Sequence, residues 1–520
     1  MATPDVRVGI DVGGTNTDAV ALDRSDALLA KVKVPTTADV TAGITAALEV
    51  VLTQLGGDRG RVTHVMLGTT HATNAILQRR GLGRVALLRI GGPATFSIRP
   101  LFAWPRDLRD TVSAGEVIVD GGIEFDGREI VPLDLGAARR FLESMAGRVD
   151  GVAVASVFAP VSAEHELAVG EAARTILGDG VHVSLSHDVG TVGLLERENA
   201  TVLNAALVGV ARTVAEALGA ALEGHGLRPA TFFAQNDGTL MALEHALRHP
   251  VLTIGSGPAN SIRGAAYLTG ARDAIVADVG GTSTDVGVLA HGFPRESTTP
   301  AEIGGVRTNF RMPDLVSVAL GGGSVVWRRD GGVEVGPESV GYRLQECALV
   351  FGGATPTLTD AAVAAGRTVL GEPEFALARG AELEPALARA DAMLADAIDR
   401  VKLARGAQPL IVVGGGSVLV PDELPGVSEV QRPEHFDVAN AIGAAIASVS
   451  GQVDRIFHPG PGGRRAAIDE ACDEARRQAV RAGADPGLIE IVEVEEIPLA
   501  YLTNPASRIR VKAAGPLGAS

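Results

Sequence analysis

Short apolar runs alternate along the chain with longer amphipathic stretches, which is the pattern of strands alternating with helices. Val62 to Leu67, Gly151 to Val157 and Val181 to Leu185 are predicted strands. The segment from Ala38 to Leu55 is a predicted helix, because apolar side chains recur on one face at helical spacing: Val40, Ile44, Ala47, Leu48, Val51 and Leu55. This alternation predicts a mixed sheet with helices on both faces.

One pattern occurs twice, nearly unchanged. Asp-Val-Gly-Gly-Thr-Asn-Thr-Asp occupies residues 11–18, and Asp-Val-Gly-Gly-Thr-Ser-Thr-Asp occupies residues 278–285. An apolar strand leads into each copy and a second short run follows it, which predicts a β-hairpin with Gly-Gly-Thr at the turn. A single hairpin of this kind could be an ordinary tight turn. Two near-identical copies, each with two Asp and two Thr, favour a functional site.

The repeated turns have the chemistry of a polyphosphate site. Glycine has no Cβ, so backbone N–H groups in the turn can approach a phosphate closely, and threonine hydroxyls add donors. Asp11 and Asp278 end the two lead strands, where each can face a magnesium ion directly or through water. We therefore predict both as catalytic and magnesium-binding residues. The predicted nucleotide-binding residues of the turns are Gly13, Gly14, Thr15, Asn16 and Thr17, together with Gly280, Gly281, Thr282, Ser283 and Thr284.

Three further glycine-containing turns are candidates for the same site. Gly68 to Thr70 opens a predicted helix whose free N–H groups suit an anion, with an ordinary threonine N-cap as the alternative. Gly255 to Asn260 is either packed near the nucleotide or a simple Gly-Pro helix start. A third turn follows the predicted strand Pro409 to Val413. Its residues are predicted at the nucleoside end of the site, with a plain loop as the alternative: Gly414, Gly415, Gly416 and Ser417.

Two stretches stand out by their residue types. Pro93 to Val131 is rich in Gly, Pro and Arg, and it contains Phe102 and Trp104, which we expect to be partly exposed. We interpret this region as a surface insertion that covers a substrate site or contacts a partner, with a packed local loop as the alternative. The longest predicted helix, Leu194 to Leu222, carries Asn199 and Asn204, which are unfavourable inside helices. Each is expected to have a hydrogen-bond partner, with a solvated polar face as the alternative.

Composition narrows the functional classes. Of 520 residues, 46% are hydrophobic and 21% charged, which predicts a globular chain of two or more domains. A formal net charge of −16 argues against nucleic-acid binding, which selects a basic face. Cys347 and Cys472 provide neither a disulfide framework nor a metal cluster. Neither a signal segment nor an 18-residue uncharged apolar run is evident, so we expect a cytoplasmic protein without membrane contact.

The repeat also predicts the fold. Two opposed hairpins that grip one polyphosphate are the arrangement of the actin, Hsp70 and sugar-kinase fold. The predicted class is therefore α/β, with two such ATPase lobes and a small C-terminal α+β element. We place the first lobe at residues 1–190, with an insertion near 93–131, the second lobe at 191–455, and the C-terminal element at 456–520.

A set of ordered motifs points to a known family. The N-terminal motifs are Val8-Gly9-Ile10, the first repeat and Leu67 to Asn74. The central motifs are Glu196 to Asn204, Gln235 to Gly238, Ser256 to Ala259, the second repeat, Gly321 to Ser324, Gly336 to Ser339 and Thr357 to Asp360. In this order they resemble the hydantoinase/oxoprolinase family over most of the chain. The sequence departs from longer members at Val316, where they carry a His, and at Tyr342 to Cys347.

The resemblance implies the short, ATP-binding A-type subunit, which the family usually pairs with a B-type subunit. The implied activity is ATP- and Mg²⁺-dependent: a small cyclic amide (a lactam, hydantoin, imide or oxoproline-like compound) is phosphorylated and then opened, because phosphorylation turns a poor leaving oxygen into a good one. The partner is expected to complete the enzyme, since no nucleophile–base pair can be named in this chain. Two alternatives remain: a small-molecule kinase of the same fold, and a non-catalytic ATP-driven chaperone or reactivating factor.

Overall fold

The computed structural model describes residues 5–36, 40–297, 299–329, 332–402, 404–457, 463–499 and 506–518. Within these residues the strands form five sheets, and the three largest carry the fold.

The largest sheet has nine strands: β1 (Val6–Val12), β2 (Asn16–Leu22), β3 (Leu28–Pro35), β4 (Val62–Thr69), β9 (Ala230–Ala234), β10 (Leu240–Ala242), β21 (Val449–Phe457), β22 (Glu490–Pro498) and β23 (Ser507–Gly515). Their order is β22-β23-β21-β10-β9-β4-β1-β2-β3. β2 pairs antiparallel with β1, whereas β4 runs parallel to β1.

Helices cover both faces of this sheet. Ala19 and Ala21 of β2 pack toward α1 (Val40–Leu55) and α7 (Leu194–Gly224). Val20 and Leu22 pack toward α14 (Ala439–Ala445). Successive side chains of a strand point to opposite faces, so this alternation is expected for a strand that is buried on both sides.

The second sheet repeats this local plan. Its strands are β11 (Ala274–Val279), β12 (Thr284–Ala290), β13 (Phe293–Pro294), β16 (Leu315–Val318), β19 (Gln408–Val413) and β20 (Val427–Gln431). β12 pairs antiparallel with β11, and β19 lies parallel to β11. Val276 packs toward α9 (Ser256–Thr269), whereas Ile275 and Ala277 pack toward α11 (Leu358–Ala364) and α13 (Gly380–Val401).

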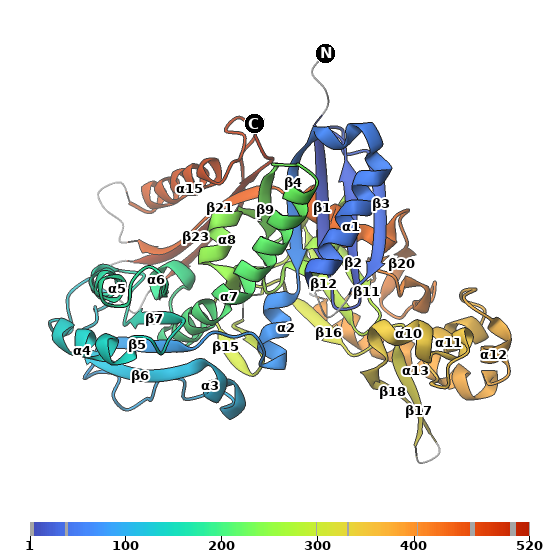
Figure 1. Ribbon diagram of the computed structural model, residues 1–520, viewed down its shortest axis with the longest axis horizontal. Coiled ribbons are helices and arrows are strands. Elements are labelled where there is room, and N and C mark those ends of the chain that lie inside the picture. The colour runs from blue at the N-terminus through green and yellow to red at the C-terminus, as the bar shows by residue number, and fades with distance from the viewer. Residues whose placement is uncertain are drawn as a thin grey trace.

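A third, all-parallel sheet lies at the lower left of Figure 1. Its strands are β5 (Val85–Gly92), β6 (Ser113–Asp120), β7 (Gly151–Ser156) and β8 (His182–Leu185), in the order β6-β5-β7-β8. α4 (Leu135–Met145) and α5 (Glu164–Leu177) cover one face, and α7 covers the other. The predicted β–α–β unit over residues 151–185 is therefore confirmed.

The expected surface insertion at residues 93–131 is only partly superficial. It contains α3 (Arg106–Val112) and the edge strand β6. Phe102 is 76% exposed, as expected. The expectation for Trp104 is wrong: its side chain is buried in a core cluster that includes residues of α7, and its indole N–H donates to the Asn199 side-chain oxygen at 2.7 Å.

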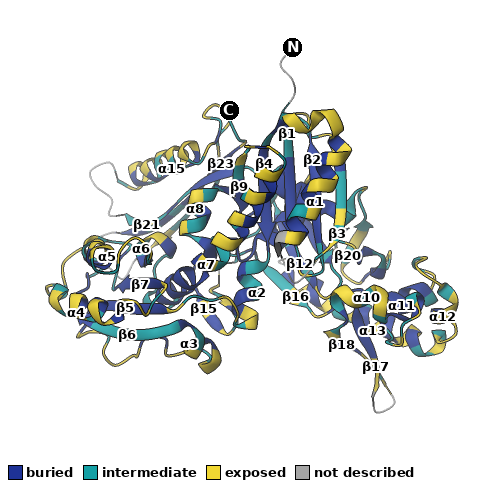
Figure 2. Ribbon diagram, viewed as in Figure 1, coloured by how far each residue is buried: buried dark blue, intermediate teal, exposed yellow. Residues whose placement is uncertain are grey.

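The C-terminal residues form the predicted α+β element and also extend the largest sheet. α15 (Gly463–Arg481) packs on β21 and β23, with Ala471, Ala475 and Val511 in their shared core. Figure 2 shows its opposite face exposed. β21 pairs in parallel with β10. This one sheet therefore contains strands from all three predicted parts of the chain, which were divided at residues 190 and 455. The domain boundaries stay a prediction.

α7 is the one helix of the described residues that is long and apolar enough to cross a membrane by length and composition alone. Half of its apolar window is buried inside the protein, where it packs on β7 and α1, as core helices do. Its two asparagines have partners, as predicted: Asn199 Nδ2 donates to the Arg307 carbonyl at 2.9 Å, and Asn204 Nδ2 donates to the Arg248 carbonyl at 2.8 Å.

The remaining elements are α2 (His71–Gln78), α6 (Ser186–Val189), α8 (Leu243–Arg248), α10 (Leu344–Cys347), α12 (Pro373–Leu377), β14 (Ala301–Ile303), β15 (Val306–Thr308), β17 (Ser324–Arg329), β18 (Gly332–Ser339) and short 3₁₀ turns.

Candidate functional site

Both predicted hairpins are present, and they have the same turn. Asp11 lies opposite Asp18 in the β1–β2 ladder, and Asp278 lies opposite Asp285 in the β11–β12 ladder. The amide of each turn's first glycine closes the turn, at 3.0 Å from Gly13 to the Asn16 carbonyl and 2.9 Å from Gly280 to the Ser283 carbonyl. In the part of the chain described, the amides of the second glycines, Gly14 and Gly281, form no hydrogen bond. These amides are therefore free for a ligand.

The two turns meet although they are far apart in sequence. A Cβ added to Gly281 would lie 3.3 Å from the Thr15 side chain. The triple-glycine segment after β16 supports the second turn from behind, because Gly322 and Gly323 donate to the carbonyls of Gly280 and Gly281 at 3.1 and 2.7 Å. The structure therefore brings the predicted residues of the two hairpins together, and their role in binding a nucleotide stays a prediction.

The threonines of the repeats divide into two kinds. Thr17 and Thr284 are fully buried, and their hydroxyl groups bond to neighbouring protein groups. Thr15 is half-buried and Thr282 is exposed, both at the tips of the turns. Only the tip threonines have hydroxyl groups placed for a ligand at the surface of the turn.

The glycine run after β19 lies against the second hairpin. A Cβ on Gly414 would lie 2.3 Å from Asp278 Oδ1, and Gly416 donates to the Val279 carbonyl at 2.7 Å. Gly415 is exposed, with open space where a Cβ would be. The Ser417 hydroxyl is buried without a hydrogen-bond partner among the described residues. The structure brings this run to Asp278, and its role at the nucleoside stays a prediction.

Side chains from two helices hold the carboxylates that end β1 and β11. Asp11 accepts from Asn260 Nδ2 at 3.3 Å and from Asn440 Nδ2 at 2.9 Å. Asp278 accepts from the Ser261 hydroxyl. Asn260 and Ser261 lie in the first two turns of α9, and Asn440 lies in α14.

Burial raises the pKa of all four hairpin carboxyl groups. It raises the pKa of Asp11 to about 7, with the charges of Asp18 and Asp278 adding to the effect, and that of Asp285 to about 6. Burial is also the main cause of the raised pKa values of Asp18 and Asp278. Of these four, among the residues described, only Asp18 forms an ion pair, with Lys33. An added cation between the hairpins would stabilise their ionised forms.

The donor set fits magnesium bound together with a nucleotide. No group of three or more His, Cys, Asp or Glu within the described ranges could hold a metal ion by protein ligands alone. Mg²⁺ usually keeps several waters and binds through one or two carboxylates plus phosphate oxygens. Asp11 and Asp278 would supply the two carboxylates. The adjacent turns, with their free amides, would hold the phosphate that supplies the other oxygens.

The Gly68–Thr70 turn lies beside the first hairpin. The Thr70 amide and hydroxyl both donate to the Val12 carbonyl, at 3.1 and 3.2 Å, and Thr70 makes no side-chain capping bond to α2. A Cβ on Gly68 would lie 2.3 Å from Asp11 Oδ1. The Thr69 hydroxyl accepts from the His71 amide at 3.2 Å, so a threonine cap of α2 and a position beside Asp11 occur together, and the anion-binding role of this turn stays a prediction.

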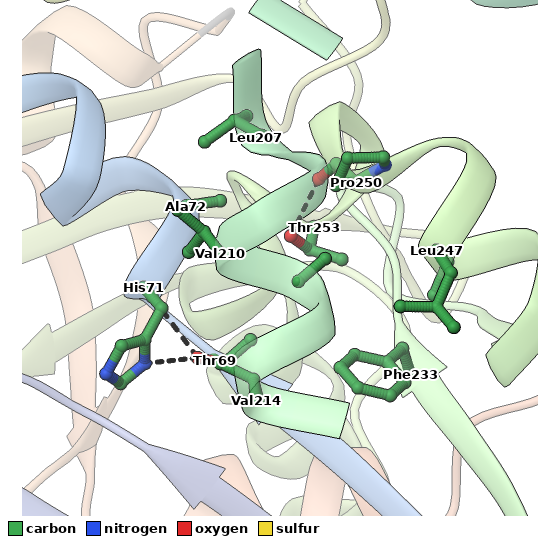
Figure 3. Close-up of a pocket in the computed structure, with 12 residues that line it drawn as sticks. Thr69, His71, Ala72, Leu207, Val210, Val214, Phe233, Leu247, Pro250 and Thr253 are labelled. Atoms are coloured by element: carbon green, nitrogen blue, oxygen red, sulfur yellow. Dashed lines mark hydrogen bonds between the residues drawn. The ribbon is translucent and has the colours of Figure 1, made fainter. Parts of the chain in front are cut away.

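A small cavity lies behind this turn (Figure 3). Apolar side chains of α7, β9 and α8 line most of it, with Thr69 and His71 at one end. The His71 ring bonds to the Thr69 hydroxyl at 2.7 Å and points away from Phe233 and Leu247. The cavity volume of about 10 Å³ holds roughly one water molecule. It is too small for a cyclic amide, so we assign it no substrate role.

Three side chains of the site were not predicted: Lys33, Ser261 and Asn440. One signal could have found Asn440, because α14 reads Ala-Asn-Ala-Ile-Gly-Ala-Ala and Asn440 is its single polar residue. A lone amide in a helix of small apolar residues indicates a buried polar partner.

The fold and site together define a class. Two sheets carry matching hairpins, each with a parallel neighbour to its first strand and helices on both faces, and the two turns meet. This is the predicted two-lobed α/β fold of actin, Hsp70 and the sugar kinases. A crystal structure of ATP-dependent caprolactamase from Pseudomonas jessenii has the same fold, with a TM-score of 0.77 and 23% identity, covering 98% of this chain and 88% of that chain.

The chain belongs to the hydantoinase/oxoprolinase family. The hydantoinase/oxoprolinase N-terminal region matches residues 7–177, and the hydantoinase/oxoprolinase region matches residues 197–384.

Two curated relatives are subunits of larger enzymes by name. The caprolactamase subunit alpha of Pseudomonas jessenii is 28% identical over 394 residues, 70% of this chain and 55% of the relative. The acetophenone carboxylase gamma subunit of Aromatoleum aromaticum is 30% identical over 404 residues, 69% of this chain and 53% of the relative. The chain thus spans about half the length of these relatives.

Proposed function

We propose that this chain is the ATP-binding, A-type subunit of a hydrolase that phosphorylates the carbonyl oxygen of a small cyclic amide and thereby drives ring opening. The substrate class comprises lactams, hydantoins, imides and oxoproline-like compounds. The observation that carries the proposal is the meeting of the two hairpin turns, each with a free glycine amide and an aspartate at its base, Asp11 buried and Asp278 half-buried. The names of the relatives, an ATP-dependent lactamase and a carboxylase, support it.

The chain's own residues would position the triphosphate. The Gly14 and Gly281 amides and the Thr15 and Thr282 hydroxyl groups would donate to phosphate oxygens. Preorganised donors of this kind stabilise charge that develops during phosphoryl transfer. The glycine run from Gly414 to Ser417 would receive the nucleoside.

Asp11 and Asp278 would hold the magnesium ion. When bound, Mg²⁺ supplies charge neutralisation to the transferred phosphoryl group. The two carboxylates are held in place by Asn260, Asn440 and Ser261, so their orientation is set before a nucleotide enters.

A B-type subunit would complete the enzyme in the cytoplasm. Phe96 and Phe102, 56% and 76% exposed, lie in the 93–131 region and offer apolar contact area to it. Exposed aromatic side chains are typical anchors of protein interfaces. The partner would shield the activated amide from bulk solvent and direct water onto it.

The test is to co-purify the chain with the product of the neighbouring reading frame and to assay lactams, hydantoins and imides. We expect ATP-dependent ring opening, with one phosphate released per ring, by the mixture and not by the chain alone. A stable phosphorylated product would instead show a small-molecule kinase. ATP turnover without opening of any ring would show a reactivating factor.

A further inference from the structure

Two asparagines on the contacting helices α9 and α14 hydrogen-bond the same carboxylate. Asn260 Nδ2 lies 3.3 Å from Asp11 Oδ1, and Asn440 Nδ2 lies 2.9 Å from Asp11 Oδ2. Asn260 belongs to α9, which packs on the second sheet, whereas Asn440 belongs to α14, which packs on the first. Each carboxylate oxygen therefore receives one amide N–H, which fixes the rotation of the carboxylate plane.

The two helices that carry these amides are in backbone contact. A Cβ on Gly264 of α9 would lie 1.8 Å from the Ala439 carbonyl oxygen. A Cβ on Gly443 of α14 would lie 1.9 Å from the Asn260 carbonyl oxygen. Only glycine at both positions allows this approach. The crossing thus places Asn260 and Asn440 at a fixed separation on either side of Asp11.

Folding alone does not explain why an amide occupies position 440. Asn is less favourable than Ala inside a helix, and every other residue of α14 is Ala, Ile or Gly. Asn440 is only half-buried, so its amide is not needed to fill the core. On other elements its side chain bonds to two carboxylates of the first hairpin, Asp11 and Asp18, and Asp11 is the residue that would face the magnesium ion.

We propose that Asn440 is a positioning residue: together with Asn260 it orients the Asp11 carboxylate toward the place where the two hairpin turns meet. The inference rests on the proposed function, because the orientation matters only if Asp11 serves phosphoryl transfer. Groups that hydrogen-bond a metal ligand from behind fix its direction, and their loss typically lowers metal affinity or activity about 10–100-fold.

The test compares Asn440→Ala and Asn440→Asp with the wild type in magnesium-dependent ATP turnover, using the full chain with its co-purified partner. Both changes remove the amide donor. Asn440→Ala adds no charge, whereas Asn440→Asp keeps the size of the side chain and places a further carboxyl group beside Asp11. We expect kcat to fall about 10–100-fold, KM for ATP to stay near the wild-type value, and half-maximal turnover to require more Mg²⁺. The triphosphate itself would still be held by the hairpin amides.

Asn204→Ala is the matched control. Asn204 is likewise a helical asparagine, fully buried whereas Asn440 is half-buried, and its partners are Ser184 and the backbone around residues 248–251. This variant should unfold more easily than the wild type and keep its kcat. Wild-type kcat in both Asn440 variants, or an equal loss of kcat in Asn204→Ala, would overturn the inference. Absence of ATP turnover in the wild type would refute the proposed function instead.

Discussion

Asp11 should destabilise the unliganded protein at neutral pH, and replacing it should stabilise the fold. Its pKa rises from 3.8 to about 7 on folding, chiefly through burial. Between these values the folded state binds more protons than the unfolded state, so stability falls as pH rises through this window. At about 1.4 kcal/mol per pH unit, the cost is about 4 kcal/mol at pH 8 and about 2 kcal/mol at pH 5.

Asp11→Asn keeps the shape of the side chain and removes this cost. The new side chain, however, has an NH₂ group where the carboxylate had its second oxygen, so the N–H of either Asn260 or Asn440 loses its acceptor. This loss costs about 1 kcal/mol of stability. We therefore expect the variant to be more stable than the wild type by roughly 3 kcal/mol at pH 8 and by about 1 kcal/mol at pH 5. The same variant should lack magnesium-dependent ATP turnover.

The assay is urea unfolding of both proteins at pH 5 and pH 8 in EDTA without nucleotide, followed by a repeat at pH 8 with Mg²⁺ and ATP. The ligands should stabilise the wild type much more than the variant. Asp179→Asn, at an exposed position, is the control and should leave the pH dependence unchanged. A variant that is less stable than the wild type at pH 8, or that gains as much from Mg²⁺ and ATP, would refute the reasoning.

Three further changes test other parts of the account. Gly415→Val should raise KM for ATP without lowering stability, because a Cβ there meets open space. The check is to measure steady-state kinetics and thermal unfolding of the same variant. Unfolding of the variant would show that the glycine run is a packing feature. Arg89→Ala should lower the free energy of unfolding by about 3–5 kcal/mol, because it leaves the fully buried Glu198 unpaired; a loss below about 1 kcal/mol in urea titration would contradict this. Phe102→Glu should reduce co-purification of the B-type partner and leave ATP binding by the chain intact, and equal recovery of the partner would move the interface elsewhere.

Local features of the site could be predicted from sequence because local rules determine them. A strand, a Gly-Gly-Thr turn and a second strand specify a hairpin without reference to the rest of the chain. The two hairpins, the glycine run at Gly414–Ser417 and the helical asparagine partners all follow from spacing and propensity. Because the same eight-residue pattern occurs twice, we also predicted that the two hairpins bind one ligand together.

Contacts across long sequence distances could not be predicted in this way. Asn440 lies 429 positions from Asp11, and nothing in its own helix names that partner. The pairing of β21 with β10 could not be predicted either. Many strand edges could pair with β21, and the apolar pattern of the two strands does not distinguish between them. Trp104 packs into a core that includes residues of α7, where Asn199 accepts its indole N–H. The composition of its own segment, rich in Gly and Pro, instead predicts a surface position.

The central claim is that the carbonyl oxygen of a cyclic amide is phosphorylated, and an oxygen-isotope transfer experiment tests it most directly. The co-purified complex would be given a cyclic amide that it opens, labelled with ¹⁸O in the carbonyl group. The released phosphate would then be analysed by mass spectrometry. We predict one ¹⁸O atom in each phosphate. Water adds to the activated carbon, the ring C–N bond breaks with the protonated amine as leaving group, and a second water then cleaves the resulting acyl phosphate at its C–O bond, so the labelled oxygen leaves in the phosphate. Ring opening that releases only unlabelled phosphate would contradict it.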